Sequence, residues 1–390
     1  MWSAAVRFLD GFSRDGREAV YFTFALLLFI ASFLLLPTTK MVNNVYYVFL
    51  AVPALVAAVR RRGRGLRWAP DLLLWTMFIA WFVIVGVWSG DGQYFKHVLY
   101  VALFVLLVRV FADPAIFRKP VFARGLFWVL TVYVMGSAVI YWIVGRYAVG
   151  ERVLWLPARM TGPIYTSMWL ACCFALALPV WLRECRRLEM GVALSVAVFC
   201  IAYVLQSRSG LFGLAVLLIL LGASAVWRRS VHSFSLIGLA AAIGGILFLL
   251  GSQVPELASL VQRADSGRFE LWAILIAEWM ECGLWTGCGM DHGIQIQLSQ
   301  GMLLHHPHNI FLALGLFSGA VALFIFLALM FTLLRRAWSR RDPWGLYLLT
   351  ALVMLNFDGT KLVGNPDELW LLVLLPAALI GNDRGRHATE

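Results

Sequence analysis

The feature that most constrains this chain is a series of apolar runs of about 20 residues, which recurs along most of the sequence. An α-helix rises about 1.5 Å per residue and the hydrocarbon core of a bilayer is about 30 Å thick, so such runs are typical of membrane-spanning helices. Hydrophobic residues make up 62% of the chain and charged residues only 14%. This balance leaves too little polar surface to coat a water-soluble domain. The sequence therefore predicts an all-α integral membrane protein.

The positions of the apolar runs predict about 12 transmembrane helices in a single polytopic membrane domain, 1–390. The predicted spans are 18–37, 44–59, 70–88, 98–112, 125–144, 164–182, 191–205, 211–227, 234–251, 310–334, 346–358 and 369–381. An even number of spans places both termini on the same side of the membrane. The first run is longer than the apolar core of a secretory signal, so we expect it to be retained.

The basic residues orient these spans, because Lys and Arg concentrate in loops that stay in the cytoplasm. Of the 32 basic residues, 22 fall on one predicted side, with dense groups at 60–67, 183–187 and 335–341. We therefore expect both termini of this multi-pass membrane protein to be cytoplasmic. The net charge of +11 is accounted for by such loops facing anionic membrane lipids, so no nucleic-acid partner is predicted.

Nine basic residues lie on the opposite, outer side, where the charge rule does not explain them. They are Lys40, Lys96, Arg146, Arg152, Arg159, Arg208, Arg263, Arg268 and Lys361. Arg208 stands in the five-residue turn 206–210 between two apolar runs, which holds its guanidinium at the membrane surface. A guanidinium fork suits the oxygens of a phosphate group, and a lipid-linked diphosphate carries its charge at that depth. The alternative is an interfacial anchor that contacts lipid headgroups.

The longest outer loop, 252–309, is predicted to carry amphipathic helices. Its clearest helical stretch is 268–282, where Leu271, Ile274, Leu275 and Trp279 follow the spacing of three and four that places side chains on one helix face. Such a helix would lie along the membrane surface and cover a cavity. The alternative is that it packs across the bundle.

Histidines gather where this loop meets the apolar run 310–334, in the sequence His305-His306-Pro307-His308-Asn309. A neutral imidazole, whose ordinary pKa is ~6.5, can accept a proton from a hydroxyl group that attacks a carbon. His308 is the best candidate base, because it directly precedes a predicted helix. His305, His306 and Asn309 are either supporting residues or plain loop.

The outer loops contain weak candidates for a metal site or a disulfide. Asp367-Glu368 is the only adjacent acidic pair, and Cys282 and Cys288 are six residues apart without a CxxC motif. In an oxidising compartment these two cysteines can form a disulfide, which the sequence leaves open. We expect neither a metal nor another cofactor, because basic side chains can neutralise a diphosphate themselves.

Three segments resemble the bacterial O-antigen ligase and polymerase superfamily, whose members are membrane glycosyltransferases of GT-C-like architecture. The family pattern has His, then Asn, Ser or Gln, nine residues, Gly, two residues, and Gly, Thr or Tyr. His308-Asn309, nine further residues and Gly319 fit this pattern, whereas Ala322 departs from it. The turn 206–210 is similar to the arginine-bearing turn of the family, and 266–272 to its Arg-x-x-x-Trp segment.

The resemblance implies a ligase that transfers a glycan from undecaprenyl diphosphate to a sugar hydroxyl of lipid A-core, with inversion at the anomeric carbon. Such a ligase would lie in the bacterial inner membrane, and 252–309 would be a large periplasmic loop whose amphipathic helices carry part of the active site. Arg208 and Arg268 would hold the donor diphosphate, Arg159 would be a third contact, and His308 would activate the acceptor hydroxyl. An O-antigen polymerase or a protein O-oligosaccharyltransferase would use the same donor chemistry, so both remain alternatives.

A secondary transporter is the alternative from a different class. Transporters usually show matched halves and charged residues near the bilayer midplane. In this chain the titratable residues gather at one outer face and no halves match. Arg109 is the exception within a span, and with Asp113 four residues on we expect it to snorkel toward the inner interface.

Overall fold

The computed structural model describes residues 14–61, 69–90, 92–160, 162–228, 267–299 and 303–383, together with Gly238 and Gly301. Within these residues, eight helices are long and apolar enough to cross a membrane, and three shorter apolar helices accompany them. The predicted span 234–251 lies outside the described residues, so the number twelve stays a prediction. The prediction of a mostly helical membrane protein is confirmed.

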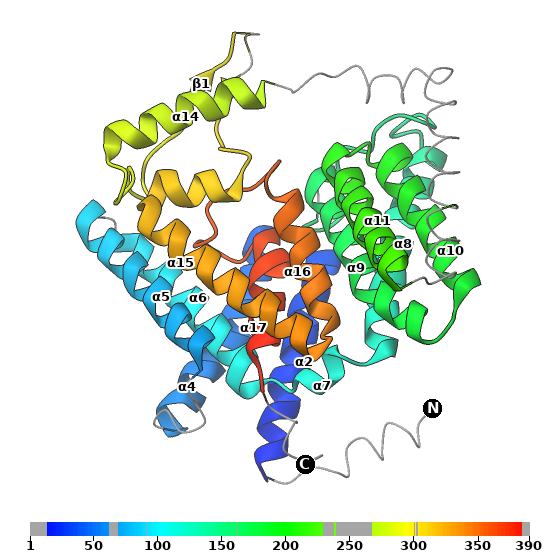
Figure 1. Cartoon of the computed structure of the whole chain (residues 1–390), viewed down its shortest axis with the longest axis horizontal. Coiled ribbons are helices and arrows are strands. Elements are labelled where there is room, and N and C mark those ends of the chain that lie inside the picture. The colour runs from blue at the N-terminus through cyan, green and yellow to red at the C-terminus, as the bar shows by residue number, and fades with distance from the viewer. Residues whose placement is uncertain are drawn as a thin grey trace.

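The elements are labelled in Figure 1. They are α2 (Arg14–Leu35), α3 (Thr39–Tyr46), η1 (Tyr47–Ala51), α4 (Val52–Arg61), α5 (Pro70–Ser89), α6 (Gly92–Leu106), η2 (Leu107–Phe111), α7 (Pro114–Phe117), α8 (Pro120–Ile143), α9 (Pro163–Arg183), α10 (Arg187–Phe199), η3 (Cys200–Val204), α11 (Arg208–Arg228), α14 (Arg268–Cys282), β1 (Ile296–Gln297), β2 (Leu303–Leu304), α15 (Ile310–Arg340), α16 (Pro343–Met354), η4 (Trp370–Leu374) and α17 (Leu375–Gly381). The η elements are short π-helical stretches that continue a neighbouring α-helix.

Proline fixes where several of the helices begin. Pro70, Pro120, Pro163 and Pro343 occupy the first helical positions of α5, α8, α9 and α16. Proline suits this position because the first helical N–H groups lack a partner within the helix. Ahead of α16, the Asp342 carboxylate accepts a hydrogen bond from the backbone N–H of Trp344, at 3.2 Å. This contact satisfies one of the unpaired N–H groups at the helix start.

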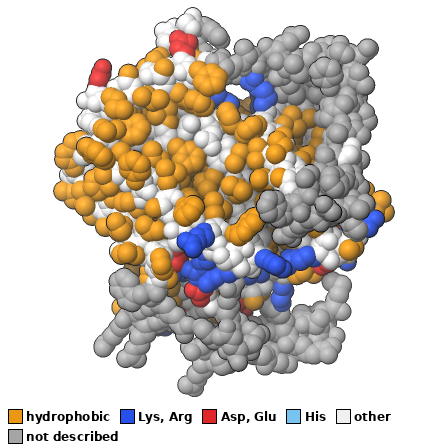
Figure 2. Space-filling view, in the orientation of Figure 1, with side chains coloured by type: hydrophobic (Ala, Val, Ile, Leu, Met, Phe, Trp, Pro, Cys, Tyr) orange, Lys and Arg blue, Asp and Glu red, His pale blue; other side chains and the backbone are white. Residues whose placement is uncertain are grey.

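Helix α9 is the centre of the bundle. It contacts α8, α10, α11 and α16, and 83% of its most apolar stretch is buried inside the protein. A helix that is apolar on all sides and also buried packs against protein rather than lipid. The surrounding helices therefore form the lipid-facing surface, and Figure 2 shows a broad apolar face on one side of the molecule.

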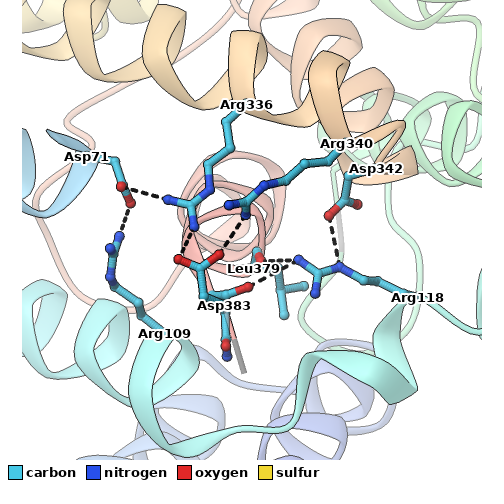
Figure 3. A network of polar contacts seen from close by, with 9 residues as sticks. Asp71, Arg109, Arg118, Arg336, Arg340, Asp342, Leu379 and Asp383 are labelled. Carbon is cyan, nitrogen blue, oxygen red and sulfur yellow. Dashed lines mark hydrogen bonds and ion pairs between the residues drawn. The ribbon is translucent and has the colours of Figure 1, made fainter. Parts of the chain in front are cut away.

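The described chain begins in α2 and ends after α17 at the same end of the bundle, the lower end in Figure 1. We call this the Arg336 end and the opposite one the Arg208 end, after residues that they carry. A network of ion pairs closes the Arg336 end (Figure 3). The Asp71 carboxylate pairs with Arg109 and, at 2.8 Å, with Arg336. Asp383 pairs with Arg336 and, at 2.7 Å, with Arg340.

The prediction that Arg109 snorkels to the interface is wrong. Its side chain is only 7% exposed, and its guanidinium is held by Asp71. Asp113 plays a local role instead, because its carboxylate accepts the backbone N–H of Ala115 at the start of α7, at 2.9 Å. A carboxylate from a different helix thus satisfies the arginine inside the protein, and the side chain has no need to reach water.

The 267–309 segment lies over the first turns of α15 at the Arg208 end (Figure 1). Helix α14 has the predicted bounds and packs against α15. Leu271 and Leu275 are fully buried, as the helical spacing predicts, whereas Ile274 is 39% exposed, so the buried face is narrower than expected. After α14, β1 and β2 form a short antiparallel pair.

Candidate active site

A cavity of about 280 Å³ opens at the Arg208 end. It is lined by residues from α11, α14 and the segment after α16, namely Arg208, Ser209, Phe212, Arg268, Phe269, Trp272 and Phe357. Near the top of Figure 2, basic side chains lie beside a hollow in the surface. The two arginines that the sequence assigns to the donor therefore share one aromatic-walled cavity, although they are 60 residues apart in the chain.

Buried polar side chains hold the turn that presents Arg208. Gln206 has a positive φ of 45°, and its side-chain amide donates to the carbonyl of Gly150, at 2.8 Å. The hydroxyl groups of Ser167 and Ser207 are 2.6 Å apart. A Cβ atom at Gly210 would lie 2.8 Å from the Ser167 side chain, so only glycine permits this approach. The turn is therefore fixed, and Arg208 enters the cavity as the first residue of α11.

Arg268 enters the cavity as the first residue of α14. Gly267 before it has φ +69°, and a Cβ atom there would meet the side chain of Leu298 at 2.4 Å. Burial lowers the pKa of Arg268, the positive charge of Arg208 lowers it further, and the Asp358 carboxylate opposes both effects. Two neighbouring guanidinium groups in a partly desolvated cavity favour an anionic ligand, because an anion relieves their repulsion.

His308 lies directly beside this cavity and is held by a carboxylate. Its Nδ1 atom is 3.2 Å from Oδ1 of Asp358, and the two side chains are 23% and 7% exposed. The backbone N–H of Gly359 donates to the same carboxylate oxygen, at 2.8 Å. An imidazole that donates Nδ1–H to a carboxylate keeps Nε2 as a hydrogen-bond acceptor. This arrangement is the one required of a general base.

The backbone around His308 joins it to the cavity wall. His308 has a positive φ of 50°, a conformation that costs a non-glycine residue free energy and is frequent at functional sites. The indole N–H of Trp272, a cavity residue, donates to the carbonyl of Pro307, at 3.0 Å. The aromatic wall is therefore hydrogen-bonded to the backbone of the residue that directly precedes His308.

The three neighbours of His308 have different surroundings. The Asn309 side chain accepts the backbone N–H groups of Phe311 and Leu312, at 2.9 and 3.1 Å, and so caps α15. The ring of His306 is 5.9 Å from that of His308. Partial desolvation and the nearby His308 lower the pKa of His306. His305 is exposed.

Arg159 does not line the cavity with the other two arginines. Its guanidinium forms two hydrogen bonds with the Glu368 carboxylate, one of them 3.1 Å long. Asp367, the other member of the acidic pair, accepts the backbone N–H of Leu369 at 3.0 Å. Burial, with the neighbouring charge of Glu368, raises the pKa of Asp367 to about 8. This acidic pair is therefore engaged with the protein itself.

Comparison with known proteins shows similarity to O-antigen ligases. Residues 193–327 match the family model described as O-antigen ligase. A curated O-antigen ligase of Pseudomonas aeruginosa is 26% identical over 358 residues, which cover 87% of this chain and 84% of that protein. The chain is thus similar to a bacterial O-antigen ligase over most of its length. This kinship indicates a glycosyl-transferring enzyme with a role in O-antigen and lipopolysaccharide biosynthesis.

The part of the chain that matches the family model contains Arg208, Arg268 and His308. Arg159 and Asp358 lie outside the matched range. The segments that carry the two cavity arginines and the histidine are thus the segments shared with the family.

Sequence reasoning missed Asp358, the partner of His308. A signal was present, because Asp358 is the only charged residue in the predicted span 346–358 and stands at its outer end. An acidic residue at a membrane edge is costly and needs a partner. The aromatic wall was also missed, because Phe and Trp in apolar runs are indistinguishable from ordinary core residues.

Cys282 and Cys288 form a disulfide. Among the residues that the structure describes, one group of three is spaced for a metal ion, and it consists of these two cysteines and His292. Both sulfur atoms are used by the disulfide, and His292 is paired with Glu278, at 2.8 Å. The three side chains are therefore engaged with one another or with Glu278 and are not available as metal ligands.

Proposed function

We propose that this chain is an O-antigen ligase that transfers a glycan from undecaprenyl diphosphate to a sugar hydroxyl of lipid A-core. One observation carries the proposal: Arg208 and Arg268 share a cavity whose wall residues Trp272 and Phe357 adjoin the pair His308 and Asp358. Trp272 donates a hydrogen bond to the carbonyl of Pro307, and Phe357 directly precedes Asp358 in the chain. The kinship with O-antigen ligases supports the reaction type.

Arg208 and Arg268 would hold the donor diphosphate through charge-assisted hydrogen bonds. As the glycosidic bond to phosphate breaks, its electron pair stays on the diphosphate, and the growing negative charge lies between two guanidinium groups that are already in place. Preorganised charge of this kind stabilises a transition state because little reorganisation is needed. Two fixed cations provide the neutralisation for which many phosphate enzymes use a metal, so we propose a metal-independent reaction.

His308 would accept the proton of the acceptor hydroxyl through Nε2 while that oxygen attacks the anomeric carbon. Attack from the face opposite the departing diphosphate inverts this carbon. The Asp358 carboxylate would hold the ring in the correct tautomer and stabilise the imidazolium ion that forms. The proton thus ends on His308 and the negative charge on the released lipid diphosphate.

Arg159 would provide a third contact to the donor diphosphate. In the present arrangement its guanidinium is occupied by Glu368, so a contact to the diphosphate requires this pair to separate. Asn309 would support the site through the cap of α15, and His305 and His306 would flank the base.

We place the protein in the bacterial inner membrane, with both termini in the cytoplasm and the cavity facing the periplasm. Support comes from the unequal distribution of basic residues. The two described chain ends also lie at the same end of the bundle, opposite the cavity.

Lipopolysaccharide banding in a ligase-null strain with compatible donor and acceptor tests the proposal. We expect the wild-type chain to restore long glycan on lipid A-core, and His308→Ala, at equal abundance in the membrane, to fail. His305→Ala is the matched control, because it removes an exposed imidazole three residues away, and it should restore the ladder. If wild type transfers nothing while glycan accumulates on the carrier, the ligase proposal is wrong and a polymerase or protein glycosyltransferase takes its place.

A further inference from the structure

Helix α15 is broken at Gly319, where the backbone leaves the helical region with φ 76° and ψ 173°. The loop Gly283–Cys288, here called the wedge loop, fills the break. The backbone N–H of Cys288 donates to the carbonyl of Leu316, at 2.7 Å, and the N–H of Ala320 donates to the carbonyl of Leu284, at 2.9 Å. The wedge loop thus replaces hydrogen bonds that the helix loses at the break.

Glycines make this insertion possible. A Cβ atom at Gly319 would lie 1.9 Å from the carbonyl oxygen of Trp285, and one at Gly287 would lie 2.6 Å from the carbonyl oxygen of Leu316. Both glycines also have positive φ, which other residues rarely adopt. The break therefore belongs to the fold and is not a local irregularity.

A second set of contacts holds the wedge loop and its flanks in place. Trp279, in the last turn of α14, packs its ring where a Cβ atom of Gly315 would lie, and its indole N–H donates to the carbonyl of Leu284, at 3.1 Å. From the other side of α15, the indole N–H of Trp81 donates to the carbonyl of Ser318, at 2.8 Å. The backbone groups freed by the break are therefore satisfied by neighbouring elements, as an apolar environment requires.

The disulfide closes the wedge loop between Cys282, the last residue of α14, and Cys288. Helix α14 begins with Arg268, and the half of α15 before the break begins two residues after His308. The wedge loop consequently connects α14, which carries Arg268, to α15, which follows His308.

We infer that the disulfide-closed wedge loop positions α14 on α15 and thereby sets the distance between Arg268 and His308. The inference rests on the proposed function. Cys282 and Cys288 act as positioning residues, because they touch neither the cavity nor the histidine. A 15-residue helix is about 22 Å long, so a tilt of about 5° at its Cys282 end moves its Arg268 end by about 2 Å. A displacement of this size exceeds the tolerance of a hydrogen bond.

The Arg268 end of α14 has anchors of its own, which limits the expected effect. The Glu270 carboxylate accepts the backbone N–H and the hydroxyl group of Ser299, at 3.0 and 2.8 Å, and Trp272 bonds to Pro307. Loss of the disulfide should therefore loosen the grip of Arg268 on the donor without abolishing transfer by His308.

The test compares wild-type protein with the double variant Cys282→Ser/Cys288→Ser, both full length in nanodiscs, at saturating acceptor and varied lipid-diphosphate donor. We expect the KM for the donor to rise at least fivefold while kcat changes less than twofold. Amide exchange should accelerate in 268–288 and at Ala320. Cys185→Ser, which removes an exposed free cysteine, is the matched control and should behave as wild type.

Treatment of the wild-type protein with dithiothreitol gives a second measurement of the donor KM, which does not depend on the folding of the double variant. Reduction of the wild-type protein should raise the donor KM in the same way, reoxidation should reverse the change, and the double variant should be insensitive. An unchanged KM after loss of the disulfide overturns the inference, as does a fall in kcat alone. If wild type transfers no glycan, the proposed function fails, and amide exchange still decides whether the wedge loop depends on its disulfide.

Discussion

Asp358 and His308 show how little a single position reveals without its partner. The two residues are 50 positions apart, and each taken alone is an ordinary polar residue at the edge of an apolar run. The sequence identified His308 because histidines cluster beside a predicted helix. It could not identify Asp358 as the partner, because the contact depends on how the segment after α16 returns to the start of α15. The carboxylate also receives the N–H of Gly359, which fixes its orientation toward the imidazole.

We predict that Asp358→Asn lowers kcat about 100-fold, the lower end of what a positioned general base contributes. Asparagine retains the size of the side chain but removes the negative charge that stabilises the imidazolium ion. The KM for the donor should stay within about twofold, since Asp358 does not line the cavity. Steady-state kinetics of the purified protein check this. A loss confined to donor KM would show that Asp358 acts on the arginines instead.

We predict that Arg208→Lys lowers kcat/KM for the donor about 10- to 100-fold, although it conserves the charge. Lysine presents a point charge and not a planar fork, so one of two charge-assisted hydrogen bonds is lost, a difference of about 1.5–3 kcal/mol. Donor titration of the variant in nanodiscs measures the effect. Arg146→Lys is the control, because Arg146 lies over the ring of Tyr141 and outside the cavity. Near-normal turnover of Arg208→Lys would rule out a bidentate contact.

At the scale of helices, the sequence predicted the features that follow from the periodicity of apolar residues. It did not predict the features that depend on contacts with another segment of the chain. The bounds of α14 followed from apolar residues at spacings of three and four, and Leu271 and Leu275 are buried as expected. The break in α15 was not predictable, because Gly315 and Gly319 four residues apart suggest close packing between two helices. In the structure the ring of Trp279 packs against Gly315, and the carbonyl of Trp285 in the wedge loop lies against Gly319. The backbone of Gly319 is also not helical.

We predict that Asn309→Ala lowers the free energy of unfolding by about 1 kcal/mol, because two backbone N–H groups at the start of α15 lose their acceptor. Asn309→Ser preserves the cap and should stay within a few tenths of a kcal/mol of wild type. Unfolding by sodium dodecyl sulfate in mixed micelles measures both variants. Equal stability of the alanine and serine variants would contradict the role of Asn309 as a cap.

At the scale of the whole molecule, α15 connects two polar sites at opposite ends of the bundle. Its first residues follow His308, and its last turns carry Arg336 and Arg340 into the network of Figure 3. The sequence predicted the excess of positive charge at this end but not its partners. Arg336 and Asp71 are 265 residues apart, and only the packing of α5 against α15 brings them together. Positive residues at this end therefore bind carboxylates inside the protein.

We predict that Asp71→Ala destabilises the protein by about 3–5 kcal/mol, because it leaves Arg109 and Arg336 buried without this carboxylate. Membrane abundance should fall, and the midpoint of thermal unfolding should drop. Asp113→Ala is the matched control, since it removes only the cap of α7 and should cost about 1 kcal/mol. Similar losses in the two variants would mean that the network contributes little to stability.

Phe357 and Asp358 share a peptide bond, although one lines the cavity and the other holds the imidazole. Any ligand that shifts the aromatic wall also shifts the carboxylate. Thermodynamic linkage then makes the effect reciprocal. If a bound diphosphate changes the proton affinity of His308 by some factor, protonation of His308 changes the affinity for the diphosphate by the same factor. If the proposed function holds, the peptide bond between Phe357 and Asp358 links the binding of the donor to the proton affinity of the base that acts on the acceptor.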